Sequence, residues 1–522
     1  MQKYNILWAD DEIDLLKPHI LFLENKDYNI TPVNNGEEAV ELCEQQHFDV
    51  VFLDENMPGM SGLEALNQIK SRKPNLPVVM ITKNEEEHIM EEAIGAKIAD
   101  YLIKPLNPSQ ILLSVKKILD NKRLITEKTN LSYQQEFRSI SMSFDDDLDH
   151  EEWADIYKKL IFWELEIDKT ENKSMAEVLT MQKDEANSRF SKFIKDNYDS
   201  WLNDPDSEKP ILSHQLMREK VFPLIKATDK SVFFVVIDNL RYDQWKIIEP
   251  AVLEYFTVEE EESYYSILPT TTAYARNSIF SGQLPDEMAV KHPDIWVGED
   301  VEEGKNNHEE DFLVRQARRL NQDLKISYNK IKNVQAGKQL VDQITNLTSN
   351  DLNVIVYNFV DMLSHARTDT AMIRELAPDE SAYRSITKSW IEHSPLLDAL
   401  RLISEAGAKL IITTDHGTIR VQKPFKIVGD RNTNTNLRYK QGKNLGYTDA
   451  NKIMEVPRPE RLNLPKVNVS TTFVFATHDQ FFAYPNNYNY YVNYYKDTFQ
   501  HGGVSMEEMI IPIISLNSKY GK

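Results

Sequence analysis

The sequence predicts an α/β protein in three parts: an N-terminal doubly wound parallel sheet, a helical middle domain and a C-terminal α/β domain. Three observations carry this prediction. Short apolar runs alternate with helical segments over residues 1–120, helical spacing dominates residues 121–205, and strand–helix alternation resumes over 206–522. A chain of 522 residues is also too long for a single hydrophobic core.

Composition narrows the compartment and the partners that we expect. No window approaches the roughly 18 uninterrupted apolar residues of a membrane span. The N-terminus lacks a signal-peptide pattern, and Cys43 is the single cysteine, so a cytoplasmic protein without internal disulfides is predicted. A net charge of −22 argues against general binding of nucleic acid through its backbone, although a metal-lined site can still hold phosphate locally.

The first 120 residues predict five strands separated by helices. The strands are expected in YNILWAD, NITPVN, FDVVFLD, PVVMIT and DYLIKP, and the intervening helices are expected to end near Asn25, His47, Lys70, Ile94 and Leu119. Strands joined by helices of this length form a parallel sheet, and the chemistry of such sheets gathers at the carboxyl ends of the strands. Polar residues follow the strands at that edge: Asp10, Asp11, Asp54, Thr82 and Lys104.

Three carboxylates at one sheet edge predict a magnesium site. Asp10, Asp11 and Asp54 would repel one another without a hard cation, and Mg²⁺ prefers oxygen ligands. A carboxylate in this setting can attack phosphorus, with the Lys104 ammonium and the Thr82 hydroxyl stabilising the phosphoryl oxygens. The alternative, that the acidic loop ends are caps, is less favoured for a whole set in this order.

This segment resembles the receiver domain of response regulators at all five positions. Tyr101, three residues before Lys104, stands where that family keeps a switch aromatic. The resemblance implies that Asp54 is the phosphoacceptor and that Asp10 and Asp11 hold Mg²⁺.

The middle segment, residues 121–205, is polar and carries aromatic and apolar residues at helical spacing, such as Trp153, Tyr157, Leu160 and Trp163. We interpret it as helices that relay between the flanking domains. No basic helix-turn-helix pattern follows the first domain, so a DNA-binding output is not expected.

Apolar strands of the C-terminal part end in residues typical of metal ligands. KSVFFVVIDN ends at Asp238, NVIVYNFVD ends near Asp361 with His365 four residues on, AKLIITTDHG ends at Asp415 and His416, and FQHGG supplies His501. Residues four apart share a helix face, so Asp361 and His365 can reach one ion. For each histidine alone a structural role is the simpler interpretation. The three aspartates and three histidines together predict two mixed oxygen and nitrogen sites, which favour zinc, with manganese as the alternative.

The stretch LPTTTAYARNSIFSG (268–282) lies between the first of these aspartates and the second pair. Its threonines suit a helix cap. They also stand where a two-metal phosphoryl-transfer site needs a nucleophile, because a metal ion lowers the pKa of a hydroxyl and a helix N-terminus offers amides to phosphate.

The order of these residues resembles the alkaline phosphatase superfamily, and HGG followed by an apolar strand is similar to its PglZ branch. The resemblance covers roughly residues 230–515. It implies two zinc ions, one held by Asp238, Asp415 and His416 together with the nucleophile, and the other held by Asp361, His365 and His501.

The superfamily pattern also implies the nucleophile. In nucleotide pyrophosphatases and sulfatases the nucleophile stands ten residues before the glycine of a Thr-Gly or Ser-Gly pair. That pair is here Ser281-Gly282, so the count selects Thr272, with Thr271 as the second candidate, and it leaves Arg276 as a contact to the substrate phosphate. Sulfatase chemistry is excluded, because its formylglycine derives from cysteine or serine.

The whole chain resembles response regulators that combine a receiver, a helical middle and a PglZ domain and are associated with type IX secretion in Bacteroidetes-type bacteria. The resemblance implies a sensor histidine kinase as phosphodonor and a sigma factor as a candidate partner. Our hypothesis is that phosphorylation of Asp54 acts through Thr82 and Tyr101, alters dimerisation or helix docking, and so controls a zinc-dependent phosphodiesterase or phosphatase. A phosphorylation-dependent homodimer is expected, and a diesterase is favoured over a monoesterase.

Nucleotide or oligonucleotide phosphoesters are the expected substrates. Part of the motive is the tyrosine-rich tract 484–495, which could stack on bases. An edge strand or a surface loop is the simpler interpretation of that tract. The alternative function is a signalling adaptor, in which the zinc domain is a protein-binding surface without physiological catalysis.

Overall fold

The computed structural model describes residues 4–83, 98–170, 172–298, 301, 304–430 and 433–520. The helix predicted to end near Ile94 lies outside these residues. The chain divides into two compact units, Met1–Ser132 and Tyr133–Lys522. Among the helices described, none has the length and apolar character needed to cross a membrane.

The first unit contains a five-stranded parallel sheet in the order β2-β1-β3-β4-β5, which confirms the predicted doubly wound fold. Its strands are β1 (Tyr4–Ala9), β2 (Tyr28–Val33), β3 (Val50–Asp54), β4 (Val78–Thr82) and β5 (Asp100–Ile103). The strand order changes direction between β1 and β3, which pair directly. The carboxyl ends of these two strands therefore meet at the point where such sheets bind ligands.

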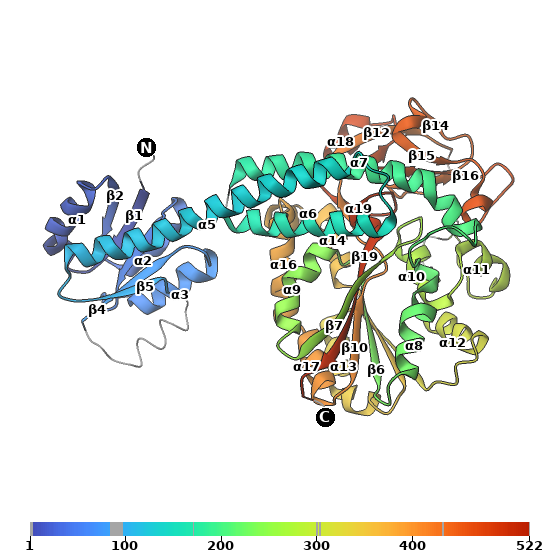
Figure 1. The fold of residues 1–522 in the computed structure, drawn as a ribbon, viewed down its shortest axis with the longest axis horizontal. Helices are drawn as coiled ribbons and strands as arrows, with labels where there is room; N and C mark the ends of the chain where they lie inside the picture. Colours follow the sequence, from blue (N-terminus) through green and yellow to red (C-terminus); the bar gives the residue numbers. More distant parts are fainter. Residues whose placement is uncertain are drawn as a thin grey trace. The chain divides into compact units, whose positions relative to one another are not determined.

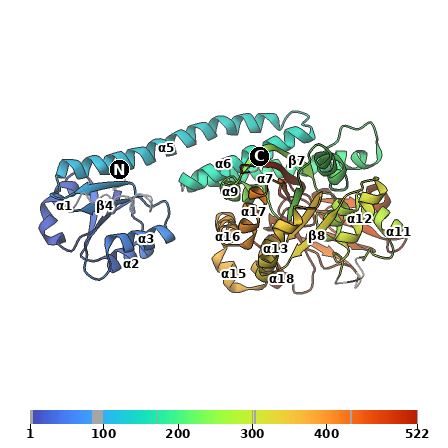
Figure 2. The same ribbon diagram turned by 90° about the horizontal axis from the view of Figure 1, so that it is seen from below.

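Helices cover both faces of this sheet (Figure 2). They are α1 (Lys17–Glu24), α2 (Gly36–Gln45), α3 (Gly62–Arg72) and α5 (Pro108–Ser143). Residues of α2 and α3 pack on one face around Leu53, and residues of α1 and the start of α5 pack on the other face around Phe52. The last helix was predicted to end near Leu119, but α5 continues to Ser143, because no proline or glycine interrupts residues 109–143.

The predicted helical middle consists of the second half of α5 and of two further helices, α6 (His150–Thr170) and α7 (Lys173–Asn203). The last two pack against each other (Figure 1). Their aromatic residues belong to the same core as the C-terminal sheet: Trp201 meets Tyr265 at a ring-centroid distance of 5.5 Å. Helices α6 and α7 are thus built into the second unit, and the domain boundaries at 120 and 205 stay a prediction.

A six-stranded mixed sheet forms the centre of the second unit, in the order β7-β19-β10-β6-β9-β8. Its strands are β6 (Val232–Ile237), β7 (Phe256–Tyr265), β8 (Ile326–Ile331), β9 (Leu352–Tyr357), β10 (Lys409–Thr413) and β19 (Ile510–Ser518). Strands β10, β6, β9 and β8 run parallel, and β19 is antiparallel to both of its neighbours. The continuous apolar runs of β6 and β9 suit strands that are buried on both faces.

Helices flank both faces of this sheet, with α9, α16 and α17 on one side and α8, α10 and α12 on the other (Figure 1). Their bounds, with those of the neighbouring helices, are α8 (Phe222–Lys226), α9 (Tyr242–Val252), α10 (Thr272–Ser281), α11 (Pro285–Lys291), α12 (Glu309–Arg319), α13 (Val334–Leu347), α14 (Phe359–Asp369), α15 (Ala371–Leu376), α16 (Glu380–Glu392) and α17 (Pro395–Glu405). Successive residues of β6 point to opposite faces of the sheet, so Phe233 packs in one core and Phe234 in another. The predicted α/β class is therefore confirmed.

Short strands between β10 and β19 form a smaller part of the second unit. They are β11 (Ile419–Arg420), β12 (Lys423–Val428), β13 (Tyr439–Gly442), β14 (Gly446–Tyr447), β15 (Ile453–Val456), β16 (Thr472–Ala476), β17 (Gln480–Ala483) and β18 (Phe499–Gln500), with helices α18 (Tyr488–Tyr495) and α19 (Met506–Met509). Single turns of other helix types lie at Ile13–Leu16, Ser213–Gln215, Met217–Val221, Ala450–Lys452 and Pro459–Leu462. Residues 488–495 of the tyrosine-rich tract form helix α18, so the interpretation as an edge strand or loop was wrong for them, whereas residues 484–487 lie in a turn.

Candidate functional site

An acidic cluster lies at the carboxyl edge of the first sheet. Asp10 directly follows β1, and Asp54 ends the neighbouring β3. Ligand atoms of Asp10, Asp11 and Asp54 lie within 4.8 Å of one another. Asp10 and Asp54 are buried, whereas Asp11 is exposed. An all-oxygen cluster that is open on one side suits a hard cation such as Mg²⁺.

Lys104 neutralises part of this cluster. Its Nζ lies 2.9 Å from Asp10 Oδ2 and 2.7 Å from Asp54 Oδ1. Burial raises the pKa of the Asp54 carboxyl, and the hydrogen bond from Lys104 acts against that rise. Lys104 therefore lies where it can stabilise charge on the oxygens of Asp54.

The two predicted switch residues lie on the adjacent strands. Thr82 ends β4, and its hydroxyl donates a hydrogen bond to Glu55, the residue after Asp54. Tyr101 lies in β5 with its side chain exposed. The structure thus brings Thr82 beside the acidic cluster and leaves Tyr101 on the surface of this unit.

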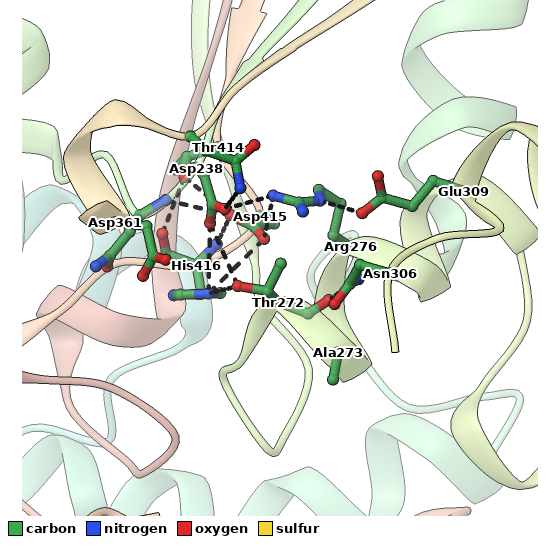
Figure 3. Close-up of polar contacts among 12 residues, drawn as sticks. Asp238, Thr272, Ala273, Arg276, Asn306, Glu309, Asp361, Thr414, Asp415 and His416 are labelled. Carbon is green, nitrogen blue, oxygen red and sulfur yellow. Dashed lines mark hydrogen bonds and ion pairs between the residues drawn. The ribbon is translucent and has the colours of Figure 1, made fainter. Parts of the chain in front are cut away.

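A second cluster forms where three neighbouring strands of the larger sheet end. Asp238 follows β6, Asp415 and His416 follow β10 after one residue, and Asp361 lies in the first turn of α14 after β9. Because β10, β6 and β9 are adjacent and parallel, their carboxyl ends bring these side chains together (Figure 3). Two groups of ligand atoms lie within 4.8 Å: Asp238, Asp415 and His416, and Asp361, His365 and His501.

The orientation of two histidines suits metal binding. His416 Nδ1 lies 3.0 Å from the Gly417 carbonyl, and His501 Nδ1 lies 3.2 Å from the Thr270 carbonyl. A carbonyl can only accept, so each Nδ1 carries the proton and each Nε2 keeps its lone pair for a cation. The two rings stack at 4.3 Å, which places the two groups side by side. Burial lowers the pKa of both histidines, so they are neutral near pH 7.

Two of the three aspartates each have one carboxylate oxygen without a hydrogen-bond donor among the described residues. Burial raises the pKa of Asp238, Asp415 and Asp361, and the charges of Asp238 and Asp415 raise that of Asp361 further. Asp361 Oδ1 and Asp415 Oδ2 accept no hydrogen bond from the part of the chain that is described. Buried carboxylate oxygens without donors, facing neutral imidazoles, fit divalent cations.

The three consecutive threonines have different surroundings. Thr272 begins α10, and its Oγ1 lies 3.1 Å from His416 Nε2 and 3.3 Å from Asp238 Oδ1. Thr271 is the N-cap residue, yet its hydroxyl forms no hydrogen bond with any described residue. The Thr270 hydroxyl donates a hydrogen bond to the Gly503 carbonyl and accepts one from the Gly502 amide, both at 3.0 Å. Among the three, the hydroxyl of Thr272 is the one brought to the Asp238 group.

Arg276 has partners other than the predicted phosphate. Its guanidinium lies 2.6 Å from Asp238 Oδ2 and donates from Nε to Glu309 Oε1 at 2.5 Å, and the side chain is 1% exposed (Figure 3). Glu309 lies in the first turn of α12, which packs against α10. Arg276 is therefore a buried ion-pair residue in this structure, and its contact with a substrate stays a prediction.

Sequence reasoning missed several residues that support the site. Asn358 donates to Asp238 Oδ2 at 3.0 Å, and Asn306 donates to the Thr272 carbonyl at 2.9 Å. Lys330 Nζ donates hydrogen bonds to the Asn306 carbonyl and to Glu309 Oε2, both at 2.8 Å. Asn358 directly follows β9, so the strand-end rule could have found it. The stretch GKNNHEED around Asn306 and Glu309 carries no spacing that would have marked it.

Comparison with known families assigns each part of the chain. A family model described as the BREX system PglZ alkaline phosphatase-like domain matches residues 216–516, more than half of the chain. The chain belongs to the PglZ family. Before the PglZ domain, residues 123–202 match the PorX response regulator linker domain, and residues 6–116 match the response regulator receiver domain. This is the arrangement of a PorX-like response regulator with a C-terminal PglZ domain, as the sequence resemblances implied.

Curated relatives are similar to a part of this chain of about 114–119 residues. The chain is 34% identical over 114 residues to the transcriptional regulatory protein ResD of Bacillus subtilis, 34% over 119 residues to the alginate biosynthesis transcriptional regulatory protein AlgB of Pseudomonas syringae, and 31% over 114 residues to the transcriptional regulatory protein SrrA of Staphylococcus aureus. These alignments cover 22–23% of this chain and 47%, 27% and 47% of the relatives, so the chain spans less than half of their length.

Solved structures also match the receiver. A CheY-like receiver domain protein from Methanospirillum hungatei is 25% identical, covers 23% of this chain and 96% of its own, and has a TM-score of 0.23. The BeF3-activated DrrB receiver domain is 28% identical, covers 23% of this chain and 99% of its own, and has a TM-score of 0.21. Receiver domains typically bind Mg²⁺ and alkaline phosphatase-like domains are typically metal-dependent, which agrees with the two kinds of ligand cluster described above.

Proposed function

We propose that this protein is a phosphorylation-controlled hydrolase of phosphoric esters, with two zinc ions in its PglZ domain and Thr272 as the nucleophile. The observation that carries the proposal is the position of the Thr272 hydroxyl, 3.1 Å from His416 Nε2 and 3.3 Å from Asp238 Oδ1. Zinc is favoured over magnesium because each ligand group contains imidazole: His416 in one, His365 and His501 in the other.

The residues around Thr272 suit attack on phosphorus. Bound zinc would lower the pKa of the hydroxyl and neutralise the phosphoryl oxygens. Thr272 loses its proton to solvent and its Oγ1 forms a bond to phosphorus, while the ester bond breaks and the leaving oxygen takes the electron pair and a proton from solvent. Water then attacks phosphorus, the bond to Oγ1 breaks, and Thr272 regains a proton as the phosphate product leaves. The N-terminus of α10, where the Thr271 side chain forms no cap hydrogen bond, would face the phosphate, and Asn306 donates a hydrogen bond to the Thr272 carbonyl.

A nucleotide or oligonucleotide diester is the proposed substrate. Helix α18 carries five tyrosines, and among them Tyr490 and Tyr491 are exposed and Tyr490 stacks on Tyr494. Exposed tyrosine rings of this kind offer faces for bases.

Control by phosphorylation is the second half of the proposal. A sensor histidine kinase would transfer its phosphoryl group to Asp54, whose oxygens already face Lys104 at 2.7 Å. The new charge would act on Thr82 and Tyr101 and change the dimerisation or the helix docking of the chain. The link to type IX secretion, a sigma factor as partner and a cytoplasmic location rest on the family resemblance and on cysteine usage, and they belong to the same proposal.

The nucleophile is tested by hydrolysis of bis-p-nitrophenyl phosphate, p-nitrophenyl phosphate and short oligonucleotides in the presence of zinc. Thr272→Val keeps the side-chain volume and removes the hydroxyl, so we expect turnover to fall by at least about 10³-fold. Thr271→Val is the matched control, because its hydroxyl has no described hydrogen-bond partner, and it is expected to keep turnover near the wild-type value. Unchanged turnover in Thr272→Val would refute the assignment, and no turnover on any ester with both metal groups filled would favour the adaptor function.

A further inference from the structure

Helix α7, in the middle part of the chain, contacts the segment that follows His501. Asn187 Oδ1 accepts a hydrogen bond from the Met506 amide at 2.9 Å, and its Nδ2 donates to Glu507 Oε2 at 2.9 Å. Met506 and Glu507 form the first turn of α19, whose amides have no partner within the helix. The side chain of Asn187 is 4% exposed, so these are buried hydrogen bonds.

The neighbouring turns of α7 contact the same segment. One turn before Asn187, Lys183 Nζ lies 3.7 Å from Glu507 Oε1 and 2.7 Å from Glu164 Oε2 of helix α6. One turn after it, the Ser191 hydroxyl lies 3.5 Å from the Val504 carbonyl. Residues four apart share a helix face, so one face of α7 is matched to residues 504–507 over two turns.

The other side of this segment holds the two loops that carry the candidate metal-binding histidines. Glu508 Oε1 accepts a hydrogen bond from the Gly503 amide at 2.8 Å, two residues after His501. The Glu508 carbonyl accepts from the Gly417 amide at 3.2 Å, one residue after His416. The approach is close: a Cβ atom on Gly417 would lie 1.9 Å from the Glu507 carbonyl oxygen.

The Glu508 carboxylate is held in place by an ion pair and by hydrogen bonds. Arg438 donates to it from Nε at 3.1 Å and from Nη2 at 2.6 Å, and both side chains are fully buried. Ser505 adds a hydrogen bond at 2.7 Å. Residues 503–508 are therefore held rigidly between α7 on one side and the loops of His416 and His501 on the other.

We propose that Asn187 is a positioning residue for His416 and His501, acting through residues 503–508. The inference rests on the proposed metal-dependent function, and it adds that a helix outside the PglZ-matched region supports the metal site. Asn187 touches neither a ligand atom nor Thr272, and its effect is to fix the backbone from which the histidines project. Partners that orient metal ligands typically change metal affinity by 10–100-fold when they are removed.

The test is a zinc titration of the full chain against a chromophoric chelator. We expect Asn187→Ala to weaken binding of at least one of the two ions by roughly 10-fold or more. Asn197→Ala is the matched control, since Asn197 lies on the same helix and donates to Phe193 within it, at 3.0 Å. We expect zinc affinity within about 2-fold of wild type for this control, and circular dichroism checks that each variant is folded.

A charge swap separates the specific hydrogen bond from general damage to the fold. Asn187→Asp keeps the acceptor for the Met506 amide but sets a carboxylate against Glu507, so zinc affinity should fall. Adding Glu507→Gln supplies a donor to the new carboxylate, and we expect the double variant to regain at least half of the lost binding free energy. A folded double variant that remains as weak as Asn187→Asp would contradict the inference, and this comparison decides the question even where Asn187→Ala does not fold.

The outcomes distinguish this inference from the proposed function. Two-ion binding that is unchanged in Asn187→Ala overturns the positioning role and leaves the hydrolase proposal standing. Normal zinc binding and the expected Asn187 effects, without ester turnover, overturn the hydrolase and leave the positioning role. A wild-type chain that binds no zinc overturns both.

Discussion

The receiver and the PglZ domain each gather aspartates at the carboxyl ends of parallel strands, but they neutralise them differently. In the receiver, Lys104 spans Asp10 and Asp54 with a side chain that is 14% exposed. In the PglZ domain, Arg276 is clamped between Asp238 and Glu309 with 1% exposure. The first cluster consists of oxygen ligands, whereas the second includes imidazole nitrogens.

The difference matches two kinds of chemistry. A lysine is a compact charge on a flexible stem, and an exposed Asp11 leaves the receiver cluster open to solvent, which suits a charge that comes and goes with phosphorylation. A rigid guanidinium and buried neutral histidines suit cations that stay bound through many turnovers. The same strand-end geometry can therefore serve a transient switch or a permanent metal centre, and the neutralising groups decide which.

Two variants, one in each cluster, test most sharply whether the receiver cluster and the PglZ cluster have separate functions. Asp54→Asn removes the acceptor carboxylate, so labelling of the chain by acetyl phosphate should be lost completely, while basal ester hydrolysis persists. Thr272→Val should do the reverse, losing turnover and keeping the label. Labelling is followed by intact-protein mass spectrometry and turnover by nitrophenol release. Label that remained in Asp54→Asn would refute Asp54 as the phosphoacceptor, and loss of basal turnover in Asp54→Asn would show that the two sites are not independent.

Metal exchange should separate the clusters by ligand chemistry. After removal of all metal with a chelator, hydrolysis is expected to fall by about 10²-fold or more, because bound metal contributes several kcal/mol to charge stabilisation. Added Zn²⁺ should restore hydrolysis, and added Mg²⁺ should restore labelling of Asp54 but not hydrolysis. Full recovery of hydrolysis by Mg²⁺ alone would contradict the distinction between the two ligand sets.

A further prediction concerns the stability of the chain, and it compares the two neutralising cations. Arg276→Ala leaves Asp238 and Glu309 buried without their shared partner, so we expect a loss of about 3–5 kcal/mol in the free energy of unfolding. Lys104→Ala should cost roughly 1 kcal/mol, because water can reach the open side of the receiver cluster. Urea unfolding of the full chain followed by circular dichroism measures both. Equal losses would show that burial does not distinguish the two cations.

Much of the fold was predictable because the strands end in the sequence where an apolar run meets an aspartate. Apolar runs that stop at Asp54, Asp238 or Asp415 locate the carboxyl ends of parallel strands in both sheets, and adjacency of the strands within each sheet then brings the residues at those ends together. The residues that surround the clusters were not predictable in the same way. Glu309 meets Arg276 across 33 positions, and Asn187 meets Glu507 across 320, so neither pairing leaves a local pattern.

Two local predictions failed for physical reasons. Helix α5 passes the expected end near Leu119 because nothing in its sequence stops it before Ser143. The tyrosine-rich tract favours strands by propensity, yet Tyr488–Tyr495 forms helix α18, where Tyr490 stacks on Tyr494 and Tyr491 on Tyr495, four positions apart. One face of this helix, Tyr488, Val492 and Tyr495, packs against the small core that includes Phe481, and this tertiary contact favours the helix.

The most direct test of the account is the zinc content of the purified chain, measured by plasma mass spectrometry after exhaustive buffer exchange. The two ligand groups predict about two zinc ions per chain, both in the wild type and in Asp54→Asn. Replacing one ligand, as in His501→Ala, should lower the content by about one ion. A chain that hydrolyses phosphoesters without zinc, or a zinc content that His501→Ala leaves unchanged, would contradict the account.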